Sequence, residues 1–186
     1  SLQDPALWKK SDRWDDDKVD TWFKTELKAG GEVGLAWTHE EVLTDIMSHY
    51  VSSYKDLPLF AYQIQTKFRN EMRAKSGIMR TREFWMKDLY SFCADQEQHD
   101  AFYEACGDAY MRIFDRLGIG DKTYKTFASG GAFTKFSHEF QTLAEAGEDI
   151  VYVNEEKGIA VNEEVLEEAD LSELGVTKDE LEKRKS

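Results

Sequence analysis

Arg69 and Glu71 are side chains whose types and spacing could do chemistry. From Leu59 to Glu71 apolar and polar residues alternate, which predicts a strand, and residues two apart on a strand share a face. A guanidinium can grip a carboxylate or phosphate, and a carboxylate beside it can accept hydrogen bonds from an amino group. The pair is therefore a candidate ligand site. The alternative is a ladder of cross-strand ion pairs on a solvated sheet face.

The charge distribution favours a ligand site in this region. The formal net charge of −13 argues against a protein that coats nucleic acid non-specifically, and the segment 148–186 is acidic. Within residues 67–82, in contrast, six basic residues stand against Glu71 alone: Lys67, Arg69, Arg73, Lys75, Arg80 and Arg82. An acidic protein that concentrates positive charge in so short a segment is expected to hold an anion there.

The segment from Thr38 to Glu41 is the second candidate. Thr38 and Glu41 have the spacing of a capping box, ahead of an apolar stripe that predicts a helix over 38–54. This interpretation leaves Glu40 without a role, and a helix N-terminus is also a polar site for a small ligand. Both interpretations stay open.

The third candidate is His138, within Ser137-His138-Glu139-Phe140. A single histidine on a strand is more often packed or exposed than catalytic. The four histidines have neither HExxH nor any other metal-binding spacing, so no metal site is predicted. Nucleophile-elbow, dinucleotide-binding and Walker motifs are also missing from the sequence.

Hydrophobic periodicity indicates the elements that must position these residues. Strands over 59–71 and 80–92, joined by a basic loop, predict an antiparallel hairpin. A long helix is predicted over 95–117, with Asp95 and Gln98 as its capping pair and Gly118 at its end. Further extended segments are expected at 32–37, 123–128, 137–144 and 150–153, and acidic helical pieces at 162–185. Helices with an antiparallel sheet, without alternating βαβ units, indicate an α+β fold.

Composition limits the class of protein. The chain has 186 residues, of which 41% are hydrophobic, enough for one domain with a core. No apolar run reaches the length of a membrane span, and no signal peptide is visible. Cys93 and Cys106 form no CxxC pair. A reducing, cytoplasmic location is therefore expected.

At the hairpin the sequence becomes specific. Phe68-Arg69-Asn70-Glu71, a loop and Arg80-Thr81-Arg82-Glu83-Phe84 resemble motif 2 of class II aminoacyl-tRNA synthetases, FRxE followed by RxxxF. Other segments narrow the resemblance to bacterial-type prolyl-tRNA synthetases. Residues 37–41 are similar to the TxE loop of that family, and the family is also matched by the segments 53–58, 86–92, 137–140 and 147–149. The resemblance covers roughly Leu7 to Val153. Asp12 departs from it, because the family tends to have glycine there.

The resemblance implies a class II synthetase-like antiparallel β-sheet flanked by helices. That fold is expected to be incomplete, since motif 1 should precede Ser1 and motif 3 should follow Ser186. Residues 1–154 would form part of the catalytic core, with the TxE loop, the motif 2 hairpin and the SHEF segment. Residues 155–186 would form an acidic helical segment where bacterial relatives carry an editing insertion.

The activity implied by the resemblance is that of a ligase. In the full-length protein, L-proline would react with ATP, bound as its Mg²⁺ complex, to give prolyl-adenylate. The prolyl group would then pass to tRNA(Pro). A homodimer and no membrane partner are expected, and the isolated fragment is expected to be inactive. The alternatives are a class II synthetase for another amino acid, and a catalytically inactive synthetase-like binding or scaffold module.

The resemblance also implies roles for single residues. Arg69 would be catalytic and would bridge the proline carboxylate and the α-phosphate of ATP. Thr38 and Glu40 would hold the prolinium nitrogen, His138 would close the pocket, and Asp88 is a weaker candidate for the proline pocket.

The nucleotide would be held by the hairpin. Glu71 would accept a hydrogen bond from the adenine amino group, and Phe84 would stack on the ring. Arg80 and Thr81 would meet the outer phosphates and the edge of the nucleotide.

Overall fold

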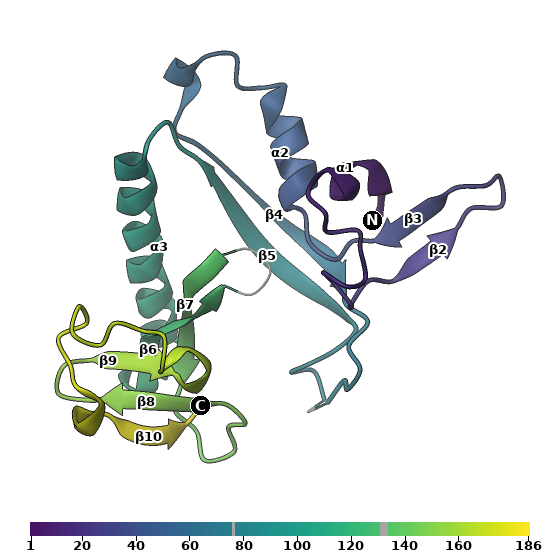
Figure 1. Ribbon diagram of the computed structural model, residues 1–186. Coiled ribbons are helices and arrows are strands. Elements are labelled where there is room, and N and C mark those ends of the chain that lie inside the picture. The colour runs from purple at the N-terminus through teal and green to yellow at the C-terminus, as the bar shows by residue number, and fades with distance from the viewer. Residues whose placement is uncertain (76, 131–133) are drawn as a thin grey trace. The chain divides into compact units, whose positions relative to one another are not determined.

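The computed structural model describes residues 1–75, 77–130 and 134–186, without the side chains of 134–136. The chain divides into two compact units, Ser1–Asp100 and Ala101–Ser186 (Figure 1). Helices and mainly antiparallel sheets occur in separate stretches of the chain, so the expected α+β class is confirmed.

The first unit opens with a small sheet around a tryptophan core. Its strands β1 (Leu2–Gln3), β3 (Glu32–Leu35) and β2 (Lys24–Glu26) are antiparallel, in that order. Helix α1 (Pro5–Lys10) begins after Asp4, whose side chain accepts a hydrogen bond from the backbone of Ala6. The buried core contains Trp8, Trp14, Val19, Trp22 and Trp37. This core anchors the segment that follows β3.

Helix α2 (Glu40–Ser48) is shorter than the expected helix over 38–54. The residues after it bond locally instead, because Asp56 accepts hydrogen bonds from the backbone of Ser52 and Ser53. Such side-chain bonds compete with helical ones. They close the turn η1 (Tyr54–Asp56).

The expected capping box at the start of α2 does not form. The N-cap residue is His39, without a side-chain cap. Glu41 accepts hydrogen bonds from Ser11 and Arg13 instead, the latter at 2.9 Å. The capping interpretation of Thr38 and Glu41 is therefore wrong, and Thr38 is available for another role.

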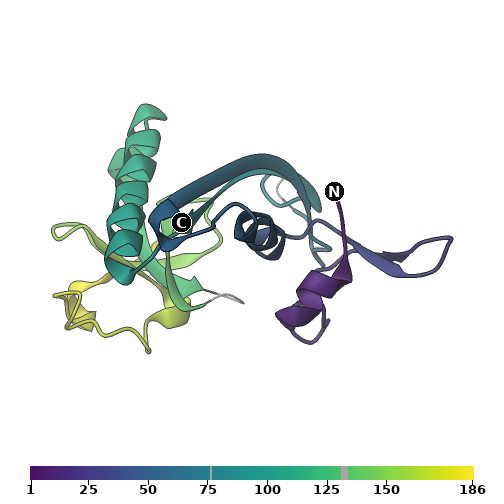
Figure 2. The same cartoon turned by 90° about the horizontal axis from the view of Figure 1, so that it is seen from above.

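The expected hairpin is confirmed in β4 (Leu59–Phe68) and β5 (Glu83–Phe92). The strands pair antiparallel from Leu59 opposite Phe92 to Phe68 opposite Glu83, as a long two-stranded ribbon (Figures 1 and 2). Residue 76, in the connecting loop, lies outside the described residues.

Arg69 and Glu71 lie beyond the end of β4, so they do not share a strand face as expected. The N–H of Arg69 still donates across the hairpin to Arg82 O at 2.9 Å. The N–H groups of Phe68 and Asn70, in contrast, donate outside the hairpin, to Ala36 O at 2.7 Å and to Thr21 O. The N–H of Glu71 then donates to Arg69 O, which closes a tight turn. These bonds dock the end of β4 on the first sheet.

The two faces of the hairpin differ in exposure, and the exposed face carries large apolar side chains. The face with Tyr62, Ile64 and Trp85 is exposed, at 70%, 63% and 81% respectively. The opposite face carries Lys67, which is fully buried. The alternation expected for the strands is therefore present, but charged and polar groups make up much of the covered face.

Helix α3 (Gln96–Arg116) begins in the first unit and continues into the second. Its capping pair is confirmed, since Asp95 accepts from the N–H of Gln98 and Gln98 accepts from the N–H of Ala94. Gly118 ends the helix with a φ of +76°, a conformation that favours glycine.

The second unit contains a five-stranded sheet. In spatial order it consists of β10 (Glu182–Lys185), β8 (Ile150–Asn154), β9 (Ile159–Asn162), β6 (Thr123–Gly130) and β7 (Thr134–Thr142). The β6–β9 pair is parallel and the others are antiparallel. The three expected extended segments of this unit are thereby confirmed. The short turn η2 (Gly120–Lys122) leads into β6.

The tail does not form the α-helical pieces expected over 162–185. It contains the 3₁₀ turns η3 (Glu163–Val165) and η4 (Lys178–Glu180), followed by β10. Val165, Leu166, Val176 and Leu181 are buried in one cluster with Val161 of β9. The tail therefore follows the sheet, because burial of these apolar side chains outweighs local helix propensity.

Backbone conformation explains the departure at residue 12. Asp12 has a φ of +58°, in the left-handed region that favours glycine. The glycine that is usual in the resembling family fits this conformation, and aspartate is among the residues that tolerate it best.

We expect Gly34→Ala to destabilise the chain by about 1–3 kcal/mol, because a side chain there overpacks the core. A Cβ atom at Gly34 would lie 2.7 Å from the Trp22 ring and 2.9 Å from the Trp14 ring. Urea unfolding of the 186-residue chain measures the effect. The matched control is Gly107→Ala in α3, where the nearest atom is the flexible Lys125 Nζ at 3.6 Å. Equal stability of wild type and Gly34→Ala would refute the close packing.

Candidate active site

Arg69 lies between two aromatic rings of the first unit. Its guanidinium carbon is 5.8 Å from the ring centroid of Trp37 and 5.5 Å from that of Phe84. Trp37 follows β3 and Phe84 belongs to β5, so the sheet and the hairpin position this cation together. Cation–π contacts at such distances attract the guanidinium toward the two ring faces.

The electrostatics of Arg69 suit an anionic ligand. Burial lowers its pKa, and the carboxylates of Glu71 and Glu40 oppose this effect. Its Nε is buried and has no hydrogen-bond partner among the described residues. A buried donor without a partner is costly, so a ligand that accepts its hydrogen bond is favoured.

Thr38 and Glu40 are joined by a hydrogen bond. Thr38 is 3% exposed, and its Oγ1 donates to Glu40 Oε2 at 2.5 Å. The carbonyl of Thr38 accepts a hydrogen bond from Gln3 Nε2 at 2.9 Å. The turn between β3 and α2 therefore fixes a carboxylate whose charge acts on Arg69.

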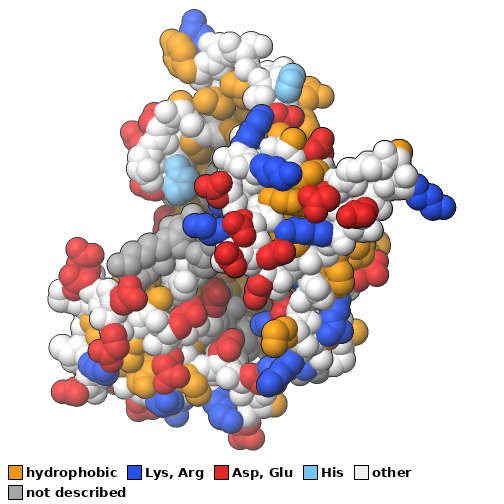
Figure 3. Space-filling model, turned by 45° about the vertical axis from the view of Figure 1, so that its right-hand side comes forward, with side chains coloured by type: hydrophobic (Ala, Val, Ile, Leu, Met, Phe, Trp, Pro, Cys, Tyr) orange, Lys and Arg blue, Asp and Glu red, His pale blue; other side chains and the backbone are white. Residues whose placement is uncertain are grey.

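The loop side of the site is more exposed. Arg80 forms an ion pair with Glu71 at 3.5 Å, and Arg82 Nε donates to Glu71 O at 3.0 Å. Thr81 Oγ1 donates to Glu83 O. On the face that Figure 3 shows, acidic and basic side chains are interspersed. This placement brings Glu71, Arg80 and Thr81 to the base of one loop.

Lys67, one of the six basic residues of the segment 67–82, is not exposed to solvent. Lys67 is fully buried, and its Nζ contacts Asp88 Oδ1 at 2.8 Å. The expectation of an anion at the basic segment stays a prediction, and Lys67 is paired with Asp88 instead. Its charge is compensated inside the hairpin, because β4 places it on the covered face.

Asp88 is held by three donors. Besides Lys67, it accepts hydrogen bonds from Gln63 Nε2, at 2.9 Å, and from the hydroxyl of Tyr90. Burial alone would raise the pKa of Asp88, but these hydrogen bonds outweigh it and the pKa lies below its usual range. Asp88 is thus a carboxylate satisfied by its neighbours in the hairpin.

His39 lies beside this ion pair. It is 4% exposed, and burial and the charge of Lys67 lower its pKa to about 4, although Asp88 acts in the opposite direction. The imidazole is therefore neutral at pH 7. It adds no charge to the site.

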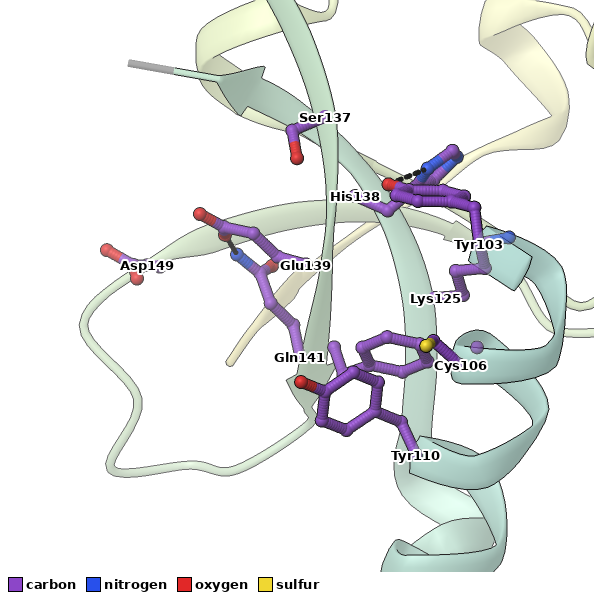
Figure 4. A pocket seen from close by; sticks show the side chains of 11 residues that line it. Tyr103, Cys106, Tyr110, Lys125, Ser137, His138, Glu139, Gln141 and Asp149 are labelled. Atoms are coloured by element: carbon purple, nitrogen blue, oxygen red, sulfur yellow. Dashed lines mark hydrogen bonds between the residues drawn. The ribbon is translucent and has the colours of Figure 1, made fainter. Parts of the chain in front are cut away.

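His138 belongs to the second unit, in a pocket of about 530 Å³ between α3 and β7 (Figure 4). Its Nδ1 lies 3.0 Å from the hydroxyl of Tyr103, toward which the ring points in Figure 4. Burial and the charge of Lys125 lower its pKa. The expected role of His138 in closing the pocket stays a prediction.

Sequence reasoning missed the contact of Trp37 with Arg69 and the hydrogen bonds that Lys67 and Tyr90 make to Asp88. Trp37 was visible as the residue before the Thr38 segment, but its contact with Arg69 depends on how the sheet meets the hairpin. Lys67 contacts Asp88 across the hairpin, so this contact depends on the register of β4 with β5. Tyr90 is two residues from Asp88 on β5, and alternation places both on one face.

Two further observations concern the described part of the chain. No group of three or more His, Cys, Asp or Glu residues there could hold a metal ion. None of the helices within those residues is both long and apolar enough to cross a bilayer.

Known proteins are similar to this chain in sequence. The family described as tRNA synthetase class II core domain (G, H, P, S and T) matches residues 23–171. The chain is 45% identical over 166 residues to a proline--tRNA ligase of Prochlorococcus marinus (strain MIT 9211), with 88% of this chain and 27% of the relative covered. The proline--tRNA ligase of Oleidesulfovibrio alaskensis is 45% identical over 155 residues, which cover 81% of this chain and 26% of the relative.

Solved structures share the fold. A structure described as the RNA binding domain of threonyl-tRNA synthetase from Cryptosporidium parvum Iowa II matches with a TM-score of 0.57 at 23% identity, over 68% of this chain and 30% of its own. A prolyl-tRNA synthetase from Cryptosporidium parvum, complexed with L-proline and AMP, matches with a TM-score of 0.52 at 17% identity, over 61% and 25% respectively. The chain spans about a quarter of the length of the curated relatives it matches. It belongs to the family of class II tRNA synthetase core domains.

Proposed function

We propose that this chain is part of a proline--tRNA ligase and contributes the residues that join proline to ATP. The observation that carries the proposal is the half-buried Arg69, held between Trp37 and Phe84 beside the Thr38–Glu40 pair. The relatives named proline--tRNA ligase support the choice of amino acid. Because the chain covers 27% of such a relative, the activity is proposed for the complete protein.

The first step joins two anions. The carboxylate oxygen of proline attacks the α-phosphorus of ATP, the bond to the β-phosphate oxygen breaks, and pyrophosphate leaves. Arg69 would contact both the carboxylate and the α-phosphate, and would bond more strongly as charge builds on the phosphoryl oxygens. The prolyl group would then pass to the 3′ end of tRNA(Pro).

Thr38 and Glu40 would recognise the amino acid. At neutral pH the proline nitrogen is a cation with two N–H donors. Glu40 would supply the opposite charge. Thr38 would fix the orientation of the Glu40 carboxylate through the hydrogen bond that joins them. His138 would close the pocket.

The hairpin would hold ATP, which binds as its Mg²⁺ complex. Phe84 would offer a ring face to adenine, and Glu71 would accept a hydrogen bond from the adenine amino group. Arg80 and Thr81, at the base of the loop, would meet the outer phosphates and the nucleotide edge.

Further assignments belong to the complete protein. We place residues 1–154 in its catalytic core and residues 155–186 where bacterial relatives carry an editing insertion. A homodimer in the cytoplasm is proposed, and the isolated 186-residue chain is expected to form no adenylate.

Amino-acid-dependent ATP–pyrophosphate exchange by the complete ligase tests the proposal. We expect exchange with proline and none with threonine, serine, glycine or histidine at equal concentration. Exchange with one of those amino acids would assign the site to another class II synthetase. No exchange with any amino acid would favour a binding module.

We expect Glu40→Gln to raise the KM for proline by about tenfold or more, because it removes the charge that pairs with the prolinium nitrogen. The KM for ATP should stay nearly unchanged. The matched control is Glu41→Gln, whose carboxylate accepts hydrogen bonds from Ser11 and Arg13 and has no proposed contact with proline. Initial rates of exchange against proline concentration give both constants. An unchanged proline KM in Glu40→Gln would remove Glu40 from the pocket.

A further inference from the structure

His138 is the member of the proposed site that belongs to the second unit. It lies on β7 opposite Phe127 of β6, and the ring of Phe127 meets the imidazole edge-on, with the ring centroids 5.8 Å apart. Tyr103 of α3 also contacts the imidazole, with the ring centroids 5.7 Å apart. Contacts from β6 and from α3 therefore restrict how the imidazole can turn.

A hydrogen bond between Tyr103 and His138 distinguishes the two ring nitrogens. The hydroxyl of Tyr103 lies 3.0 Å from His138 Nδ1, and Figure 4 shows these side chains directed toward each other at the edge of the pocket. The imidazole ring is rigid, so Nε2 is directed away from the hydroxyl that Nδ1 faces. Nε2 is therefore the nitrogen left for a ligand.

The imidazole of His138 is neutral at pH 7. Burial lowers its pKa, the positive charge of Lys125 acts in the same direction, and Glu104 opposes both. Lys125 and Glu104 themselves form an ion pair at 3.0 Å. A neutral imidazole carries one ring proton, so one of its nitrogens donates a hydrogen bond and the other accepts one.

The acidity of the two groups decides the direction of the hydrogen bond. The hydroxyl of a phenol is a stronger acid than the N–H of a neutral imidazole. The unprotonated imidazole nitrogen is in turn a stronger base than a phenol oxygen. The hydroxyl of Tyr103 therefore donates to Nδ1 of His138, and the ring proton lies on Nε2.

We propose that Tyr103 is a positioning residue that keeps His138 in its Nε2–H form, so that His138 meets the substrate as a hydrogen-bond donor. Such a donor fits a carboxylate or carbonyl oxygen of the amino acid. It does not fit the prolinium nitrogen, which also donates and is assigned to Glu40. The contact with the amino acid rests on the proposed function, whereas the position of the ring proton does not.

Nitrogen-15 NMR of the 186-residue chain tests the position of the proton, because a ring nitrogen changes its chemical shift when it carries one. Loss of a signal in His138→Gln identifies His138 among the histidines. We expect the wild-type proton on Nε2. In Tyr103→Phe, the ratio of the Nε2–H form to the Nδ1–H form should fall about 3–10-fold, the equivalent of one hydrogen bond. A wild-type proton mainly on Nδ1, or an unchanged ratio in Tyr103→Phe, would overturn the proposal.

Tyr110→Phe is the matched control. Tyr110 lies on the same helix and lines the same pocket, and its ring packs on Phe140 with centroids 5.0 Å apart (Figure 4). Loss of its hydroxyl should leave the protonation of His138 unchanged. Equal changes in Tyr103→Phe and Tyr110→Phe would indicate a general loss of packing and would also overturn the proposal.

Initial rates of exchange by the complete ligase test the donor role. We expect His138→Ala to raise the KM for proline by about tenfold, with the KM for ATP within about twofold. His138→Gln should raise the proline KM less, because the glutamine amide also supplies an N–H donor. Equal losses in His138→Ala and His138→Gln would contradict donation by Nε2.

A double-mutant cycle tests whether Tyr103 acts through His138. Tyr103→Phe alone should raise the proline KM about 3–5-fold, because the imidazole loses its fixed orientation and part of its donor form. Added to His138→Ala, the same change should raise it by less than about 1.5-fold, since no imidazole remains to be positioned. Fully additive effects would overturn the positioning role.

The two kinds of measurement keep this proposal apart from the proposed function. If the complete ligase exchanges with an amino acid other than proline, the same variants are judged by the KM of that amino acid. If it exchanges with none, the donor role falls together with the proposed function. The NMR ratio then still decides whether Tyr103 sets the protonation of His138.

Discussion

Replacing Arg69 by alanine is expected to lower the kcat of proline-dependent ATP–pyrophosphate exchange by about 10²–10³-fold. The guanidinium is held between Trp37 and Phe84 and keeps a buried Nε without a partner among the described residues. A donor fixed in advance stabilises developing charge without reorganising. Its loss should therefore affect turnover more than the affinity for either substrate.

Two variants make the Arg69 result specific. Arg69→Lys keeps the positive charge but loses the planar fork, so activity should fall between that of wild type and Arg69→Ala. Arg112→Ala removes a similar charge from an exposed position of α3 and should leave the exchange rate within about twofold. If Arg69→Ala raised only the KM for ATP, Arg69 would be a binding residue without a role in the chemical step.

Lys67→Met is expected to destabilise the 186-residue chain by about 3 kcal/mol, because it leaves the Asp88 carboxylate buried without its counter-charge. Urea unfolding measures the loss. Adding Asp88→Asn should recover part of the stability, since the unpaired charge is then removed. The control is Lys87→Met on the exposed face, which should stay within about 0.5 kcal/mol of wild type. Equal losses for Lys67→Met and Lys87→Met would contradict the buried ion pair.

The sequence was sufficient for the elements that depend on local pattern. The extended segments 59–71 and 80–92 predicted the hairpin, whose strands each end three residues nearer than expected to the far end, at Phe68 and Glu83. The Asp95–Gln98 cap and Gly118 bounded α3 within about a residue. In each of these cases the deciding interactions lie close together in the chain or follow from simple periodicity.

Other features depend on tertiary contacts, which alternation does not encode. The apolar stripe up to Tyr54 suggested a longer α2, but hydrogen bonds to Asp56 close a separate turn. In the tail, helix propensity yielded to burial of Val165 and Leu181 beside β9. The sequence shows that Val165 and Leu181 are apolar, but it does not show that they pack beside β9.

The site was predicted in its residues more than in its geometry. Arg69 and Glu71 were expected on one strand face, whereas β4 ends at Phe68 and a turn carries them. Lys67 and Asp88 are 21 positions apart, and only the register of the hairpin brings them together. The motif identified Arg69. The structure adds the contacts of Arg69 with the rings of Trp37 and Phe84, and the Lys67–Asp88 ion pair within the hairpin.

The most direct test of the central claim is a crystal structure of the complete ligase with a non-hydrolysable sulfamoyl analogue of prolyl-adenylate. The distances to measure are those from Arg69 to the acyl carbonyl and sulfamoyl oxygens, and from Glu40 to the ring nitrogen. We predict that Arg69 contacts both oxygens and that Glu40 contacts the nitrogen within hydrogen-bonding distance. An analogue bound away from Arg69, or with its ring nitrogen turned away from Glu40, would contradict the account.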